Sequence, residues 1–160
     1  MKKKIHDQYF IDIVNQNKTG LYREAYSYLQ NAADAEDAVS NTILKAYEKI
    51  ETLKDIRKMK AWLYRILVNE CKDMIKKRNK WSYVEMSVSE IEYPNNNEED
   101  SDLYDVVCSL ESPFKEISLL FYFENFKIKE IADILNLPDG TVKSRLARAR
   151  KQIKKIMLVH

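Results

Sequence analysis

The chain has 160 residues, with 27 lysines and arginines, 25 aspartates and glutamates, and a formal net charge of +2. It has only two glycines, which excludes glycine-rich phosphate-binding loops and argues against a sheet protein with many hairpin turns. Its abundant Lys, Glu, Leu, Ile and Ala favour helices, so the composition predicts an all-α protein of one ordinary domain or two small ones.

The first 50 residues are expected to form two helices. Apolar residues at helical spacing predict a helix over about 8–30, with a break at 17–20 where Gly20 follows three polar residues. A second apolar stripe predicts a helix over about 34–50. Its first residue, Asp34, can accept hydrogen bonds from the free backbone amides of the first turn, so it is the expected N-cap.

A third helix is expected from about Met59 to Arg78, because its apolar residues again recur at helical spacing. Its last turns are strongly basic, which favours contact with a polyanion. Basic residues also stabilise the negative end of a helix dipole, so a purely structural explanation stays open. The basic residues of these turns are Lys72, Lys76, Lys77, Arg78 and Lys80.

A polar and acidic stretch separates this helix from the rest of the chain. Residues 81–114 contain nine acidic residues and no lysine or arginine, and 93–100 contain a proline and three asparagines without helical or strand spacing. We therefore expect two small helical bundles, at 1–80 and 103–160, joined by a flexible acidic linker over 81–102.

The second bundle is expected to begin with two helices. Apolar spacing predicts a short helix over 103–110. The next should run from Pro113 to about Phe123, with Ser112 as its N-cap, since proline is favoured at the first helical position.

A helix-turn-helix is predicted for the end of the chain. A short helix over 128–135 should end at Asn136 in the left-handed conformation, and Gly140 should lie in the tight turn that follows. Asp139 or Thr141 can cap the last helix. The alternative to a DNA-binding helix-turn-helix is a helical hairpin that contributes only to the packing of the bundle. The apolar stripe of the last helix comprises Val142, Leu146, Ala149, Ile153 and Ile156.

The small net charge conceals a strong pattern along the chain. Residues 54–80 carry a net charge of +7, residues 81–114 carry −9, and residues 141–160 carry +7 with no acidic residue. Two basic blocks on separate helices indicate a polyanionic partner better than a single block does, because one block is commonly just a solvated face.

Cysteine usage and hydropathy point to a reduced compartment. Cys71 and Cys108 are isolated in the sequence, which predicts two ordinary thiols rather than a disulfide framework or a metal site. Polar residues interrupt the segment after the basic N-terminus, and no apolar run approaches the length of a membrane span. We therefore expect a cytosolic protein.

Three segments resemble motifs of bacterial RNA polymerase sigma factors. Residues 34–47 resemble the helix that binds core polymerase, 59–78 the helix that reads the −10 element and melts DNA, and 128–150 the helix-turn-helix that reads the −35 element. Their order and spacing are similar to the extracytoplasmic-function (ECF) group. The resemblance implies that 1–80 is sigma region 2 and 103–160 is sigma region 4.

The resemblance also implies the partners. Members of this group are not enzymes and need no cofactor or small-molecule substrate. They are alternative sigma factors that bind RNA polymerase core, through its clamp helices and flap, and direct it to promoter DNA. Members are cytoplasmic proteins. An anti-sigma factor that is often anchored in the membrane commonly holds them inactive on its cytoplasmic side.

Matching positions imply which residues contact each partner. The residues expected to bind polymerase lie on one helix and are Asp37, Asn41, Leu44 and Lys45. The residues expected to bind the −10 element and melted DNA are Leu53, Asn69, Lys72, Lys76, Lys77 and Arg78. The residues expected to bind the −35 element are Thr141, Lys143, Ser144, Arg145, Arg148 and Lys151.

Two other classes of function are alternatives to a sigma factor. A helix-turn-helix regulator that acts without polymerase would need a dimerisation surface and would bind duplex DNA by itself. A helical enzyme acting on nucleic acid would need a metal-carboxylate cluster or a nucleophile beside a base. The acidic residues gather in the expected linker and the two histidines lie at the chain ends, which disfavours the enzyme.

Overall fold

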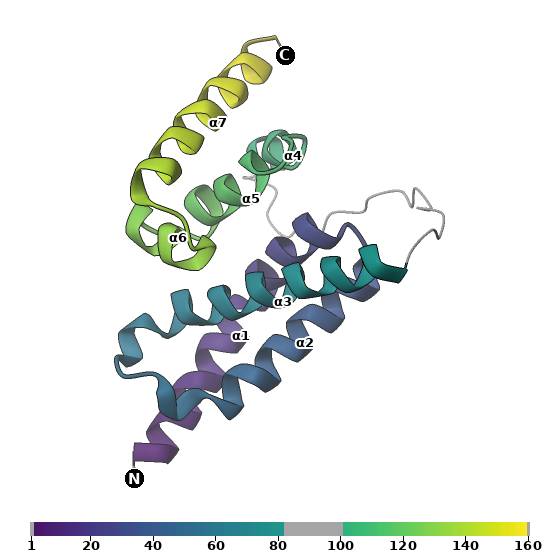
Figure 1. The fold of residues 1–160 in the computed structure, drawn as a ribbon. Helices are drawn as coiled ribbons and strands as arrows, with labels where there is room; N and C mark the ends of the chain where they lie inside the picture. The colour runs from purple at the N-terminus through teal and green to yellow at the C-terminus, as the bar shows by residue number, and fades with distance from the viewer. Residues whose placement is uncertain (1, 82–100, 160) are drawn as a thin grey trace. The chain divides into compact units, whose positions relative to one another are not determined.

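The computed structural model describes residues 2–81 and 101–159, with side chains described for 7–79 and 102–159. Within those ranges the chain is helical and contains no strand. It divides into two compact units, Met1–Glu92 and Tyr93–His160, which confirms the all-α prediction with two helical bundles (Figure 1). Most of the expected acidic linker lies outside the described residues.

The first unit is a three-helix bundle. Its helices α1 (Lys2–Leu29), α2 (Ala32–Glu48) and α3 (Met59–Trp81) pack against one another in all three pairs (Figure 1). Two short 3₁₀ turns, η1 (Ile50–Thr52) and η2 (Ile56–Lys58), connect α2 to α3. Burial of large apolar side chains drives this packing. The largest fully buried apolar side chains of the unit are Leu21, Leu29, Met59, Leu63, Tyr64, Leu67 and Val68.

The expected break at 17–20 is wrong, because α1 continues through Gly20. The Asn17 amide donates to the carbonyl of Ile13 at 2.7 Å, so this polar side chain is satisfied within the helix. A glycine inside a helix costs about 0.5–1 kcal/mol relative to alanine. Complete burial of Leu21 and Ala25 on the next turn offsets that cost.

The N-cap of α2 also differs from the prediction. Asn31, rather than Asp34, caps the helix: its backbone is extended, and its side-chain oxygen accepts from the backbone N–H of Asp34 at 2.9 Å. Asp34 lies inside the first turn, where its carboxylate suits the positive end of the helix dipole.

The second unit is built around the last helix. Its elements are α4 (Ser101–Cys108), α5 (Phe114–Ser118), the π-helical turn η4 (Leu119–Phe123), α6 (Ile128–Leu135) and α7 (Asp139–Val159). α7 packs against α4, α5 and α6. The core between α7 and its neighbours combines aliphatic and aromatic side chains, among them Tyr104, Val107, Leu110, Leu119, Ala149 and Ile153.

Helix α5 begins and ends at other residues than predicted. Pro113, not Ser112, occupies the N-cap position, and no side chain caps the helix. The Ser112 hydroxyl instead donates to Glu116 Oε1 at 2.5 Å, because the nearly buried Glu116 carboxylate requires a hydrogen-bond donor. The expected single helix to Phe123 changes to π-helical geometry at Leu119.

The helix-turn-helix is present as α6, a tight turn and α7. Asn136 ends α6 in the left-handed conformation, with φ 54° and ψ 53°, as predicted. The predicted place of Gly140 is wrong, because it lies in the first turn of α7, where a Cβ would meet open space. Asp139 and Thr141 also lie inside α7, so neither occupies the capping position.

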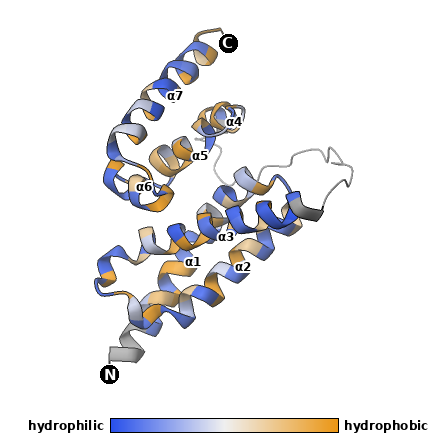
Figure 2. Ribbon diagram, viewed as in Figure 1, coloured by the Kyte–Doolittle hydropathy of each residue, from blue (hydrophilic) through white to orange (hydrophobic). Residues whose placement is uncertain are grey.

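Hydropathy along the helices follows the packing. The predicted apolar stripe of α7 is confirmed, with Val142, Leu146, Ala149 and Ile153 buried. Hydrophilic residues cover much of the rest of this helix (Figure 2). Among the described residues, no helix is both long enough and apolar enough to cross a membrane.

Candidate nucleic-acid interface

The side of α7 opposite its buried stripe is basic. Lys143, Arg148 and Lys151 are exposed, while Arg145 is half-buried at the margin. Arg148 and Lys151 are three residues apart, so they lie on neighbouring turns of one face. The structure thus brings the residues predicted to read the −35 element onto one helix, with their charged groups accessible to a polyanion.

Two of the predicted residues on α7 have polar rather than charged side chains. Thr141 is half-buried in the first turn, and Ser144 is exposed one turn later. The Ser144 hydroxyl lies 3.1 Å from the Gly140 carbonyl and 3.2 Å from the Thr141 carbonyl, to which it donates. The hydroxyl proton is directed at the helix backbone, so the Ser144 oxygen presents its lone pairs outward as an acceptor.

Arg150 is held by another element. It is exposed, and its Nε donates to the hydroxyl of Tyr122 on η4 at 3.3 Å. This hydrogen bond ties the middle of α7 to the π-helical turn.

The basic end of α3 combines three exposed lysines with one engaged arginine. Lys72, Lys76 and Lys77 are exposed. Arg78 pairs with Asp34 in the first turn of α2 and also donates to the carbonyl of Leu29 at 3.2 Å. Arg78 therefore braces the junction between α1 and α2. Its guanidinium is committed within the bundle, whereas the ammonium groups of the three lysines belong to exposed side chains.

Replacing Arg78 with methionine is expected to lower the free energy of unfolding of the first unit by about 1 kcal/mol, a modest effect because the ion pair is partly exposed. Chemical denaturation followed by circular dichroism measures this change. Lys77→Met is the matched control, since Lys77 is the exposed neighbouring residue on α3. Equal losses in the two variants would contradict the brace.

The two uncharged residues predicted to read the −10 element lie on different elements. Asn69 is exposed near the middle of α3. Leu53 is half-buried directly after η1, where its backbone N–H donates to the Ile50 carbonyl at 3.2 Å. Both side chains belong to the first unit.

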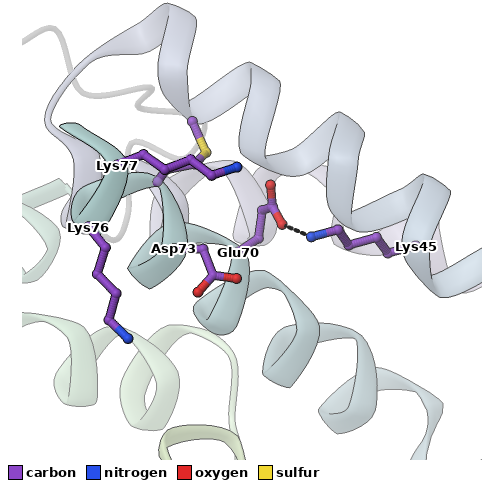
Figure 3. Close-up of a pocket in the computed structure, with 6 residues that line it drawn as sticks. Lys45, Glu70, Asp73, Lys76 and Lys77 are labelled. Atoms are coloured by element: carbon purple, nitrogen blue, oxygen red, sulfur yellow. Dashed lines mark hydrogen bonds and ion pairs between the residues drawn. The ribbon is translucent and has the colours of Figure 1, made fainter. Parts of the chain in front are cut away.

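The residues predicted to bind polymerase lie on the outer surface of α2. Asp37 and Leu44 are exposed, and Leu44 keeps 63% of its surface accessible. Asn41 and Lys45 are exposed too, but both contact Glu70 on α3. Asn41 donates to its carboxylate, and Lys45 pairs with it (Figure 3). Glu70 was not among the residues predicted from the sequence.

Glu70 lies beside a pocket of 240 Å³ in the first unit (Figure 3). The sequence contained a sign of its burial. Glu70 is an acidic residue on the apolar stripe of α3, three residues after Leu67 and seven after Leu63. Charged residues at such positions need a partner. The pocket is lined by Lys45, Glu70, Asp73, Met74, Lys76 and Lys77.

Both units of the chain match regions of known proteins. Residues 13–81 match Sigma-70 region 2, and residues 102–153 match Sigma-70, region 4. The chain is 34% identical to RNA polymerase sigma factor SigV of Bacillus subtilis over 96% of this chain and 93% of that one. It is 31% identical to the ECF RNA polymerase sigma factor SigW of the same species, over 96% and 91%.

The chain belongs to the ECF group of RNA polymerase sigma factors. Sigma factors are transcription initiation factors rather than catalysts, and their regions 2 and 4 bind the −10 and −35 promoter elements. The basic helices α3 and α7 lie in regions 2 and 4 of this sigma factor, respectively.

Solved structures of other proteins have the same fold. The sigma factor RpoE from Bartonella quintana, crystallised with the anti-sigma factor NepR, aligns with a TM-score of 0.73 and 25% identity over 98% of both chains. CnrH, solved in complex with the cytosolic domain of CnrY, aligns with a TM-score of 0.64 and 20% identity over 98% of this chain and 97% of that one.

The two cysteines of this sigma factor lie in the cores of the two units. Cys71 and Cys108 are thiols that form no disulfide, and both are buried. Burial raises the pKa of the Cys71 thiol from an ordinary 9.0 to about 12, with the nearby carboxylates of Glu24 and Glu70 acting in the same direction. The thiolate is the nucleophilic form, so Cys71 is an unreactive core residue.

Cys71 is expected to resist iodoacetamide in the folded protein at pH 8 for as long as the urea-unfolded chain takes to react fully. A pKa of about 12 leaves the thiolate about a thousandfold rarer than in a free thiol at the same pH. Mass spectrometry of peptides containing Cys71 measures the modification. Alkylation of folded and unfolded chains at equal rates would show that the thiol is accessible.

Proposed function

We propose that this sigma factor binds RNA polymerase core through the exposed face of α2 and directs it to promoters by using α7 and α3. One observation carries the proposal. Sigma regions 2 and 4 occur in order on two separate units, and each presents basic residues on an exposed part of one helix. This arrangement suits two promoter elements separated along DNA.

In region 4, α7 is proposed to enter the major groove of the −35 element. Arg145 and Arg148 are the candidates for base reading, because an arginine can donate two hydrogen bonds to a guanine edge. Ser144 and Thr141 can contact bases or phosphates, and Ser144 suits a donor such as an exocyclic amino group. Lys143 and Lys151 are proposed to hold phosphates, which positions the helix without reading sequence.

In region 2, α3 is proposed to engage the −10 element and the melted strand. Lys72, Lys76 and Lys77 supply phosphate contacts from the basic end of the helix. Asn69 can read a base edge, and Leu53 can give an apolar platform to a base flipped out of the stack. Arg78 is proposed to act indirectly, by keeping this end of α3 against α2.

On α2, Asp37 and Leu44 are proposed to contact the polymerase clamp helices directly. Tyr47, three residues along α2, is exposed as well, and neighbouring exposed apolar side chains favour a binding surface more than a single one does. Asn41 and Lys45 share this surface. Region 4 is proposed to contact the polymerase flap as well.

An anti-sigma factor is proposed as a third partner. The two similar solved structures are complexes, one with an anti-sigma factor and one with a cytosolic domain. The proposal places this chain in the cytoplasm, where such a partner, held at the membrane, would cover the surfaces that polymerase needs. Co-purification of a membrane protein with the tagged chain, lost on Leu44→Asp, tests this partner.

The main proposal is tested with purified chain and core RNA polymerase. The chain should co-elute with core polymerase in gel filtration and should enable run-off transcription from a subset of a genomic promoter library. Leu44→Asp should abolish co-elution while leaving the circular dichroism spectrum unchanged. A stable dimer that binds duplex DNA and ignores polymerase would overturn the proposal.

A further inference from the structure

Glu70 on α3 is an acidic residue in a nearly buried position. Its side chain is only 9% exposed, whereas its neighbour Asn69 is exposed. A carboxylate removed from water is strongly destabilising unless its oxygens accept hydrogen bonds or it pairs with a cation. The partners of Glu70 therefore show what this position is built to hold.

Both carboxylate oxygens of Glu70 are engaged by α2. Oε1 accepts from the Asn41 side-chain amide at 3.2 Å. Oε2 pairs with the ammonium of Lys45 (Figure 3). Asn41 and Lys45 are one helical turn apart, so a single acid holds two consecutive positions on one face of α2. The hydrogen bond that the Lys45 ammonium donates to Glu70 is the largest cause of a raised pKa at Lys45, which favours the charged form of this lysine.

The neighbouring acid does not share this role. Asp73 lines the same pocket one turn further along α3 (Figure 3). Its side chain is exposed, and its charge is the smallest of the causes that raise the pKa of Lys45. Water can stabilise the charge of Asp73, whereas Glu70 depends on its two partners. The bridge between the helices is therefore specific to Glu70.

We infer that Glu70 is a positioning residue that holds Asn41 and Lys45 in one orientation on the polymerase-facing side of α2 and ties this side to the DNA-facing helix α3. This inference rests on the proposed binding of polymerase by α2. The Lys45 side chain is 47% exposed and would otherwise sample many rotamers. Fixing it before binding reduces the entropy that complex formation must remove, so affinity rises.

The link also joins two functions along α3. Glu70 directly follows Asn69, the residue proposed to read a −10 base. A polymerase contact that shifts Lys45 would act on Glu70, and through the helix backbone on the position of Asn69. Glu70 thus connects the polymerase-binding surface to the proposed base-reading residue within a single bundle.

A double-mutant cycle with the full-length chain tests the inference. Affinities for core RNA polymerase are measured by fluorescence anisotropy for the wild type, Glu70→Gln, Lys45→Met and the double variant. Each single variant is expected to bind about tenfold more weakly, and the double variant no more weakly than either single one, because the two residues act as a unit.

Folding is monitored separately, because Glu70 also contributes to the stability of the bundle. All affinities are measured at a temperature where every variant keeps the circular dichroism spectrum of the wild type. Asp12→Asn is the charge control. It removes one negative charge from an exposed residue of α1 while keeping an oxygen to accept from Gln8. This control should bind polymerase as the wild type does.

The outcomes separate this inference from the function on which it rests. If the wild type does not bind core polymerase, the proposed function fails. If the wild type binds and folded Glu70→Gln binds equally well, the positioning role is overturned. Additive losses of about a hundredfold in the double variant would also overturn it, because Glu70 would then not act through Lys45.

Discussion

Replacing Arg148 with alanine is expected to weaken binding of the polymerase holoenzyme to the −35 element about 5- to 150-fold, equivalent to about 1–3 kcal/mol. Arg148 is exposed on the basic side of α7, opposite the stripe that packs into the core, so the variant should fold normally. Fluorescence anisotropy with labelled promoter fragments, at several salt concentrations, measures the loss. Arg145→Ala should show a similar loss.

The salt dependence distinguishes the possible roles of each arginine. A base-reading arginine should relax discrimination at one position of the −35 element, whereas a phosphate contact should weaken binding to all sequences and reduce the salt slope. Arg150→Ala is the matched control on the same helix, because Arg150 donates to Tyr122. Unchanged binding and transcription by both Arg145→Ala and Arg148→Ala would defeat the assignment of this face.

Replacing Asn69 with alanine is expected to slow promoter opening about tenfold while leaving the affinity for core polymerase unchanged. The loss corresponds to about one buried hydrogen bond to a flipped base. Permanganate footprinting of the −10 region measures opening, and anisotropy measures polymerase binding. Because an exposed asparagine to alanine change favours a helix, the bundle should not be destabilised.

Asn79→Ala controls for the loss of an exposed amide elsewhere on α3. It should open promoters as the wild type does, since Asn79 lies near the end of the helix and carries no proposed role. Equal losses of opening and polymerase binding in Asn69→Ala would indicate that the first unit is misfolded, and the proposed base-reading role of Asn69 would be withdrawn.

Helix positions were predicted well because their signal is local. Apolar spacing alone identified α3, α6 and the buried stripe of α7, since a helix must present one face to a core. The left-handed Asn136 followed from the chemistry of a single residue. Errors gathered where local preference was weak, as at Gly20, which packing of the adjacent leucine holds within α1.

The roles of individual charged side chains depended on partners distant in the sequence. Arg78 counted as one of several basic residues until the fold placed it against Asp34, 44 residues away. Glu70 was an unremarked acid until the fold placed it against Asn41, 29 residues away. Spacing along one helix cannot reveal these contacts.

The two helical bundles, the two basic helices and the family of the chain could be predicted from the sequence, because each depends on residue type and spacing within one segment. Which charges stabilise the protein and which stay exposed could not be predicted in this way. Solvation depends on burial, and burial depends on how separate helices pack. Packing leaves Arg148 exposed to solvent and commits Arg78 to the bundle.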